Sequence, residues 1–176
     1  MIFFSCFYLA LLLAPGCVKS NKTTEHWELL SPQRDLSVAI SHKNEAESPD
    51  SPQSKRLYYS LKRNETTLIE PSPLGLVIEQ EEQDHDISSN LTFISSANST
   101  DATNYSVRTG KRSERSYEFN AQTLQFKTEN GLVLTVEFRA YNDGIAFRYQ
   151  LSGQGEVKVI EEKTGFKIPE DSYALM

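Results

Sequence analysis

The stretch from Leu132 to Leu151 constrains the fold more than any other part of the chain. Apolar and polar residues alternate along it on both sides of Asp143-Gly144, and an alternation with a period of two is typical of half-buried strands. Asp-Gly between two such runs is a strong hairpin signal, because both central residues of a type I′ turn need a positive φ. We therefore predict two antiparallel strands joined by a two-residue turn.

This turn sets a register in which one face of the hairpin is wholly apolar. A slip of one residue would place Phe138 opposite Arg148 and destroy that face, so the pattern rejects it. The cross-strand pairs predicted on the apolar face are Ala140 with Phe147, Phe138 with Tyr149, and Val136 with Leu151.

The other face of the predicted hairpin places Arg139 directly across from Arg148. Like charges in this position destabilise a strand pair unless something neutralises them. In one interpretation Glu137 or another acid bridges the two arginines, or water solvates them. In the other, the two guanidinium groups bind a carboxylate from another element or domain, because each presents a planar fork of donors. The sequence leaves both interpretations open.

The rest of the chain favours an all-β fold of antiparallel strands. No segment shows an apolar repeat of 3.6 residues over three turns, whereas short alternating runs separated by turn residues recur from Trp27 to Pro169. Such a pattern is typical of a sandwich or barrel. Between Leu91 and Phe119, we expect short strands separated by Ser-, Asn- and Thr-rich connections. The net charge of −6 argues against general binding of nucleic acid, which needs a basic face.

The first residues have the pattern of a bacterial export signal. The run from Ile2 to Ala14 is apolar apart from Ser5, and it is short for a membrane span. Leu13 to Cys17 resembles a lipobox, although no Lys or Arg precedes the apolar run. Lipidation of Cys17, cleavage to a free protein and an uncleaved anchor all stay open. We expect the protein to be exported to the periplasm, or to the outer membrane as a lipoprotein.

The predicted domain organisation has three parts. They are a signal peptide over residues 1–17, a polar tether over 18–26, and a β-domain over 27–176. The motifs of common catalytic sites are absent from the sequence: there is no Gly-rich phosphate loop, no Gly-x-Ser-x-Gly elbow and no Cys/His cluster with metal-ligand spacing. Composition and spacing alone therefore indicate an exported β-domain without a visible active site.

Several motifs occur in an order that resembles a known family. They are Trp27-Glu28-Leu29-x-Ser31-Pro32, Leu57-Tyr58-Tyr59, Pro71 to Leu76, Arg139 to Tyr149, and Glu162 to Phe166. Together they look like the N-terminal domain of glycoside hydrolase family 97. The block from Arg139 to Tyr149 is the most specific, and its motif residues are Arg139, Tyr141, Asp143, Gly144, Phe147, Arg148 and Tyr149.

The resemblance implies an antiparallel β-super-sandwich, here incomplete, from an exported bacterial enzyme that hydrolyses α-glucosidic or α-galactosidic bonds. In the family, this domain packs on a (β/α)8 barrel that carries the catalytic carboxylates and most calcium ligands. Glu162, in Glu162-x-Thr164-x-Phe166, best fits the one acid that the domain contributes to calcium, for which carboxylate oxygen is a suitable ligand. A solvated acid at a strand end is the alternative.

The chain ends at Met176, before the sandwich would be complete and before any barrel. Glycoside hydrolysis needs two carboxyl groups flanking the scissile bond, and the family pattern places neither here. We therefore expect a fragment from a truncated or split gene, with no catalytic residue, no activity and no bound calcium of its own. Its expected partners are a separately encoded barrel, an α-glucoside or α-galactoside, and a membrane if Cys17 is lipidated.

Two other functions compete with this interpretation. The first is a free-standing carbohydrate-binding module, for which no binding residue is assigned and against which most aromatic residues are expected in the core. The second is a non-functional gene remnant, because the unpaired strand edges of an incomplete sandwich can template aggregation.

Overall fold

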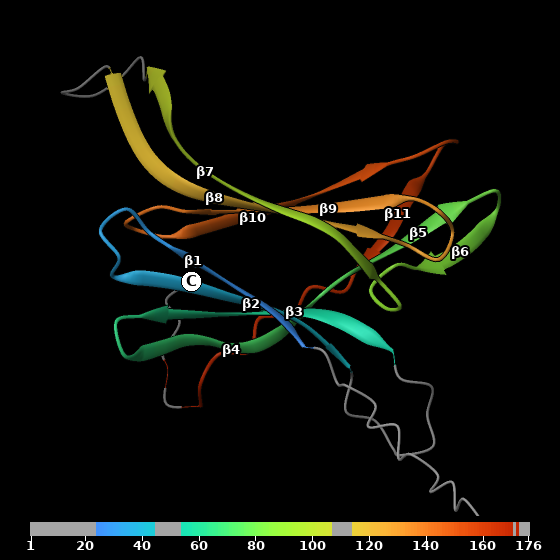
Figure 1. The fold of residues 1–176 in the computed structure, drawn as a ribbon, viewed down its shortest axis with the longest axis horizontal. Helices are drawn as coiled ribbons and strands as arrows, with labels where there is room; N and C mark the ends of the chain where they lie inside the picture. Colours follow the sequence, from blue (N-terminus) through green and yellow to red (C-terminus); the bar gives the residue numbers. More distant parts are fainter. Residues whose placement is uncertain (1–23, 45–53, 107–113, 171, 173–176) are drawn as a thin grey trace, which may run out of the picture.

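The computed structural model describes residues 24–44, 54–106, 114–170 and 172 (Figure 1). These residues form β-strands and no helix, as the sequence predicts. The strands are β1 (Glu25–Leu30), β2 (Leu36–Asn44), β3 (Lys55–Arg63), β4 (Thr66–Leu74), β5 (Leu76–Gln80), β6 (Gln83–Asp86), β7 (Thr92–Ser106), β8 (Glu114–Lys127), β9 (Val133–Ala140), β10 (Ile145–Ser152) and β11 (Lys158–Glu162).

Two four-stranded antiparallel sheets face each other as the layers of a sandwich (Figure 1). One has the order β1-β2-β3-β4 and the other the order β10-β9-β8-β7. A smaller sheet, β11-β5-β6, lies at one end. Neighbouring strands in each of the two large sheets are consecutive in the sequence, so each sheet is a simple antiparallel meander without crossovers.

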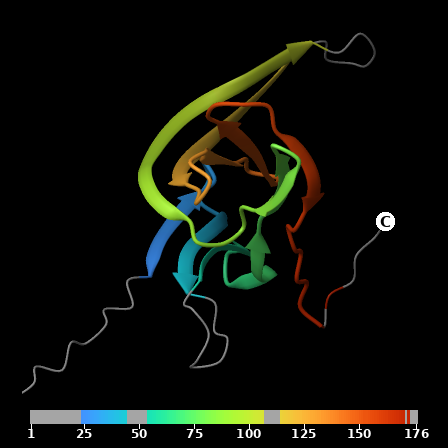
Figure 2. The same ribbon diagram turned by 90° about the vertical axis from the view of Figure 1, so that its right-hand side faces the viewer.

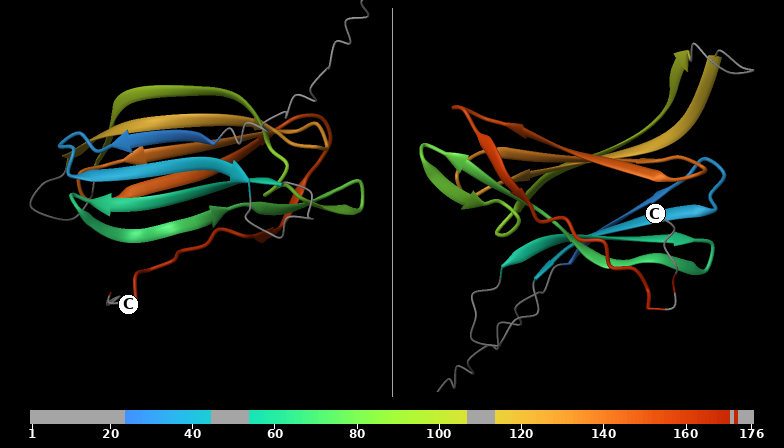
Figure 3. Two further views of the ribbon diagram at one scale, coloured as in Figure 1. Left: turned by 60° about the horizontal axis from the view of Figure 1, so that its bottom comes forward. Right: turned by 180° about the vertical axis from the view of Figure 1, so that it is seen from behind.

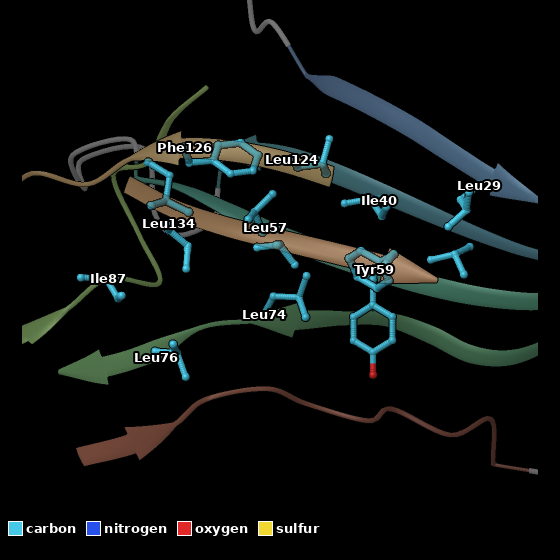
Figure 4. Packing of buried hydrophobic residues seen from close by; sticks show 14 of the residues in the cluster. Leu29, Ile40, Leu57, Tyr59, Leu74, Leu76, Ile87, Leu124, Phe126 and Leu134 are labelled. Atoms are coloured by element: carbon cyan, nitrogen blue, oxygen red, sulfur yellow. The ribbon is translucent and has the colours of Figure 1, made fainter. Parts of the chain in front are cut away.

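The core lies between the two large sheets and follows from strand alternation. In β2 the side chains of Val38 and Ile40 are fully buried while the residues between them are not, and in β9 the same holds for Val136 and Phe138. Figure 4 shows Tyr59 reaching across this core with its hydroxyl pointing out of the apolar cluster. Each sheet therefore has one dry face and one wet face, as is usual for antiparallel sandwiches.

The central hairpin has the predicted faces but not the predicted pairs. Phe147 pairs with Phe138, so the register is shifted by two residues from the prediction. The loop is correspondingly wider: the Tyr141 N–H donates to the Gly144 carbonyl at 2.8 Å, and Gly144 does not have a positive φ. A shift of two preserves which side chains share a face, which is why the apolar face was predicted correctly.

Contacts from the other sheet hold the wider loop in place. The Gln33 N–H donates to the Asn142 side-chain oxygen at 2.9 Å, and the Arg63 guanidinium donates to the Asn142 carbonyl at 3.3 Å. Such long-range contacts are invisible to a local turn rule. Elsewhere local turn chemistry suffices, since Asn64 after β3 and Gly131 after β8 adopt positive φ values of 50° and 83°.

Three other predicted boundaries were wrong. The Ser- and Asn-rich stretch after Leu91 is one continuous strand, β7, because it pairs with β8 along almost its whole length. β1 begins at Glu25, so residues 25 and 26 belong to the sheet and not to a tether. The strand predicted at Phe166 to Pro169 is a single bridge, in which the Glu70 N–H donates to the Lys167 carbonyl at 2.8 Å.

The segment after β11 runs along the edge of β4 and links the two layers of the sandwich (Figures 2 and 3). The Lys163 N–H donates to the Gly75 carbonyl and the Gly165 N–H donates to the Pro73 carbonyl, both at 2.9 Å. Gly165 is required here, since a Cβ would lie 2.9 Å from the Pro73 ring. This edge segment, residues 163–170, therefore covers part of an edge that would otherwise be open.

Candidate functional site

The charged face of the central hairpin is a closed ion cluster. In the observed register Arg148 lies directly opposite Glu137, and Arg139 lies opposite Ala146. One carboxylate oxygen of Glu137 accepts from Arg139 Nε at 2.6 Å, and the other accepts from Arg148 Nε and Nη2 at 2.9 and 2.5 Å. Glu137 therefore bridges both arginines, which confirms the first of the two interpretations.

The electrostatics of the cluster follow from these hydrogen bonds. Burial acts to raise the pKa of Glu137, but the hydrogen bonds from Arg139 and Arg148 outweigh it and lower that pKa. The hydrogen bond to Glu137 raises the pKa of Arg139. The Arg139 guanidinium also lies 4.7 Å from the centre of the Phe119 ring, within cation–π distance. Glu137 thus sets one negative charge between the two positive charges of Arg139 and Arg148.

Most of the described aromatic residues lie in or against the core, as expected, but a few continue this outer face. Phe119 packs against Tyr141 with ring centres 5.2 Å apart. Farther along β7 and β8, Tyr105 and Tyr117 stack with parallel rings whose centres are 5.8 Å apart. Strand periodicity within β7 and β8 would have assigned them to one face, but only the observed pairing shows that this face points away from the core.

Two tyrosine hydroxyls fix the edge segment to the sandwich. The Tyr149 hydroxyl accepts from the Gly75 N–H at 3.2 Å and shares a hydrogen bond of 2.7 Å with the Thr164 hydroxyl. The Tyr59 hydroxyl donates to the Gly165 carbonyl at 3.0 Å. Burial raises the pKa of Tyr149 to about 12, with the nearby charge of Glu162 adding to the effect. The motif residue Tyr149 therefore has a structural role that sequence alone did not assign.

Glu162, the predicted calcium ligand, lies at the end of β11 opposite Leu76 and is exposed. Within residues 24–44, 54–106, 114–170 and 172, no group of three His, Cys, Asp or Glu residues is arranged to hold a metal ion. The carboxylate of Asp86 on β6 contacts the edge segment: it accepts hydrogen bonds from Lys163 Nζ at 2.9 Å and from the Ser88 N–H.

The C-terminal edge exposes an apolar surface. The side chains of Val159 and Phe166 are 55% and 62% exposed, and those of Ile160 and Ile168 are nearly as exposed. Beside them is an apolar depression of about 370 Å³, lined by Leu76, Tyr149, Leu151, Val157 and Val159. We call these four exposed residues and this depression the apolar edge. Exposed apolar side chains that gather at one edge are one of the features of interaction sites.

Cys17 and the rest of the predicted signal and anchor lie outside the described residues. In the part of the chain that the structure describes, no helix is long and apolar enough to cross a membrane.

The comparisons with known proteins agree on one family. A family profile described as Glycosyl-hydrolase 97 N-terminal matches residues 29–176. A retaining alpha-galactosidase from Bacteroides thetaiotaomicron is 28% identical over 170 residues, which cover 93% of this chain and 22% of that protein. The chain therefore spans about a fifth of the length of the curated relative it matches.

Two solved structures share the fold. A beta-arabinopyranosidase crystal structure has 31% sequence identity and a TM-score of 0.67, and the match covers 82% of this chain and 21% of that one. A glycoside hydrolase family 97 enzyme from Pseudoalteromonas sp. strain K8, in complex with panose, has a TM-score of 0.64 at 21% identity, covering 82% of this chain and 20% of that one.

Proposed function

Because this chain belongs to the glycosyl-hydrolase 97 N-terminal family, we propose that it serves as a non-catalytic scaffold domain. In this role it packs against the catalytic domain of an α-glycosidase and borders the substrate pocket. The chemistry belongs to the catalytic domain, because glycoside hydrolysis needs two suitably placed carboxyl groups and the family pattern assigns neither to this chain.

The apolar edge is the observation that carries this proposal. Val159 and Phe166 are more than half exposed, so each forgoes about 1–2 kcal/mol of the stabilisation that full burial of its side chain would give. The charged Glu70–Lys167 pair lies beside them at 2.6 Å. An apolar centre with a polar rim is the usual anatomy of a protein interface, which supports docking of a further domain at this edge.

The substrate class of this proposal comes from the relatives. A retaining alpha-galactosidase is similar over nearly the whole chain, and one structure of the same fold holds panose. We accordingly place the domain in an enzyme acting on an α-galactoside or α-glucoside. Glu162 is too exposed and too isolated to hold calcium by itself, so its proposed contribution is one carboxylate to a site whose other ligands the catalytic domain supplies.

Export is the remaining part of the proposal. The apolar run before Cys17 and its lipobox-like context support an enzyme held in the bacterial envelope. Incorporation of radiolabelled palmitate into the expressed chain, and its loss in Cys17→Ser, would test lipidation. A labelled Cys17→Ser chain would contradict it.

A domain exchange tests the scaffold function. Residues 24–172 replace the matching part of the Bacteroides thetaiotaomicron alpha-galactosidase, and the hydrolysis of an aryl α-galactoside and the thermal midpoint are measured. We expect the hybrid to be active. We expect the double substitution Phe166→Ser with Ile168→Ser to lower both its rate of hydrolysis and its thermal midpoint. Ile94→Ser, a comparably exposed apolar residue on β7, is the matched control. Equal effects of the edge and control substitutions would refute docking at the apolar edge.

A further inference from the structure

A two-stranded arm projects from the sandwich and has no place in the scaffold function. β8 pairs with β9 only from Asn120 onward, so the part of β8 before Asn120 pairs with β7 alone. Figure 1 shows β7 and β8 rising together beyond the ends of β9 and β10, and Figure 3 shows the same from behind. An isolated two-stranded ribbon is marginally stable in water. Contacts between side chains of the arm are therefore needed to stabilise it.

The aromatic residues of the arm share the face that points away from the core. β9 buries its even-numbered residues, such as Phe138, and Ala121 of β8 pairs with Arg139 on the opposite face. Strand alternation then places Phe119 and Tyr117 on the side of Arg139. Asp101 pairs with Phe119, so alternate residues of β7 share this side as far as Tyr105.

These residues form one continuous strip. Tyr105 and Tyr117 stack at the outer end, with Tyr105 46% exposed. Two residues along β8, about 7 Å away, Phe119 lies under the Arg139 guanidinium and beside Tyr141. Stacking between the tyrosines contributes to arm stability, but it leaves ring surface exposed to solvent.

We infer that this strip, Tyr105, Tyr117, Tyr141 and Arg139 with Asp101 at its rim, is a binding surface for a neutral oligosaccharide. The apolar C–H face of a pyranose ring packs on an aromatic ring face, and tyrosine offers a polar group at the edge of the same ring. Guanidinium and carboxylate groups beside the rings are suitable partners for vicinal hydroxyls, since they present paired donors and acceptors.

Shape and charge favour a sugar over other ligands. Two strands span only roughly 10 Å, which is narrow for a protein interface that must bury about 800 Å² on each side. Glu137 forms ion pairs with both Arg139 and Arg148, and Asp101 adds a second carboxylate across from Phe119, so these four groups together carry no net charge that would attract a polyanion. Within the arm, the outward positions of β7 are Asp101, Thr103 and Tyr105, two polar side chains and one aromatic ring, which suits a hydrated ligand.

Chemical-shift mapping on the full chain tests the inference directly. Labelled protein is titrated with panose and, separately, with raffinose as an α-galactoside. We expect fast-exchange binding in the millimolar range, with the largest amide shifts at residues 101–105, 116–119 and 139–141. Absence of shifts at saturating sugar, or shifts confined to another surface, would overturn the inference.

Two double variants separate ring stacking from arm folding. Tyr105→Ala with Tyr117→Ala should weaken binding by about tenfold or more, whereas Tyr105→Phe with Tyr117→Phe keeps both ring faces and should retain binding within about threefold. Tyr58→Ala, on the wet face of the other sheet, is the matched control and should bind normally. Loss of binding in the phenylalanine pair with an intact arm in the amide spectrum would refute stacking, as would unchanged binding in the alanine pair. Because these readouts involve neither hydrolysis nor docking, the inference can fail while the scaffold function stands.

Discussion

The Tyr149 hydroxyl gives the sharpest quantitative test of how the edge segment is held. It accepts a hydrogen bond from the buried Gly75 N–H and shares another with Thr164. Tyr149→Phe removes both while keeping the ring, whose centre lies 5.8 Å from that of Phe147. Since a buried N–H loses its partner, we expect a loss of about 1–3 kcal/mol in the free energy of unfolding at pH 8.

The pH dependence of this loss is set by the raised pKa of Tyr149. The ordinary pKa of a tyrosine phenol is 10.0, and burial raises that of Tyr149 to about 12 in the folded protein. A raised folded pKa gives stability that is fully present below pH 10 and is lost as the pH rises through the folded value, because the unfolded chain ionises first. At pH 11 the full shift would cost the wild type about 1.4 kcal/mol. Partial exposure of the ring reduces our expectation to about 1 kcal/mol.

The measurement compares urea unfolding of the wild type and Tyr149→Phe at pH 8 and pH 11. The difference between the two proteins should be about 1 kcal/mol smaller at the higher pH, because only the wild type carries this titrating phenol. Thr164→Val is the matched control: it breaks one hydrogen bond but keeps the phenol, so its alkaline loss should follow that of the wild type. An identical difference at both pH values would refute the reasoning.

Three further predictions follow from the ion cluster and the family. Glu137→Gln should lower the free energy of unfolding by about 1 kcal/mol at pH 7. Because the two arginines hold the pKa of Glu137 below its ordinary value of 4.5, that difference should vanish as the pH falls from 4.5 through the folded pKa, and a difference that persists in acid would contradict the bridge. The purified chain should release no sugar from aryl α-glucosides or α-galactosides, and measurable release would show that catalysis does not need the barrel. Calorimetric titration of the chain with calcium should give no saturable binding. Stoichiometric calcium binding that Glu162→Gln abolishes would contradict this, because it would show that other residues of the chain complete a calcium site with Glu162.

The sequence predicted what depends on local alternation and missed what depends on distant contacts. The apolar face of the central hairpin followed from a period of two, and Gly131 followed from turn chemistry. The pairs of that hairpin did not, because Asn142 is held by Gln33 and Arg63 from the other sheet. The polar composition of β7 concealed a strand for a related reason: pairing with β8 stabilises it, and β-propensity is weak compared with such context.

The same distinction applies to the candidate sites. The Arg139 block was recognised from its sequence, and Glu137, only two residues from Arg139, bridges its two arginines, a pairing that was anticipated as one option. The apolar edge was not anticipated, because no local sequence pattern determines whether Val159 and Phe166 are exposed. The stacked tyrosines of the arm lie twelve positions apart in sequence and meet only through the long hairpin.

The apolar edge and the aromatic strip occupy different parts of the fold, and this separation has a consequence for the whole enzyme. β11 lies at the end of the sandwich opposite the arm (Figure 1), so docking through β11 leaves the arm free for a sugar chain. Substitutions at Phe166 and Ile168 should therefore alter the thermal midpoint of the hybrid enzyme but leave oligosaccharide binding by the isolated chain unchanged. Substitutions at Tyr105 and Tyr117 should do the reverse, and in the hybrid they should slow hydrolysis of a long substrate more than that of a short aryl galactoside. Equal slowing of both substrates would show that the arm acts through folding rather than through sugar binding.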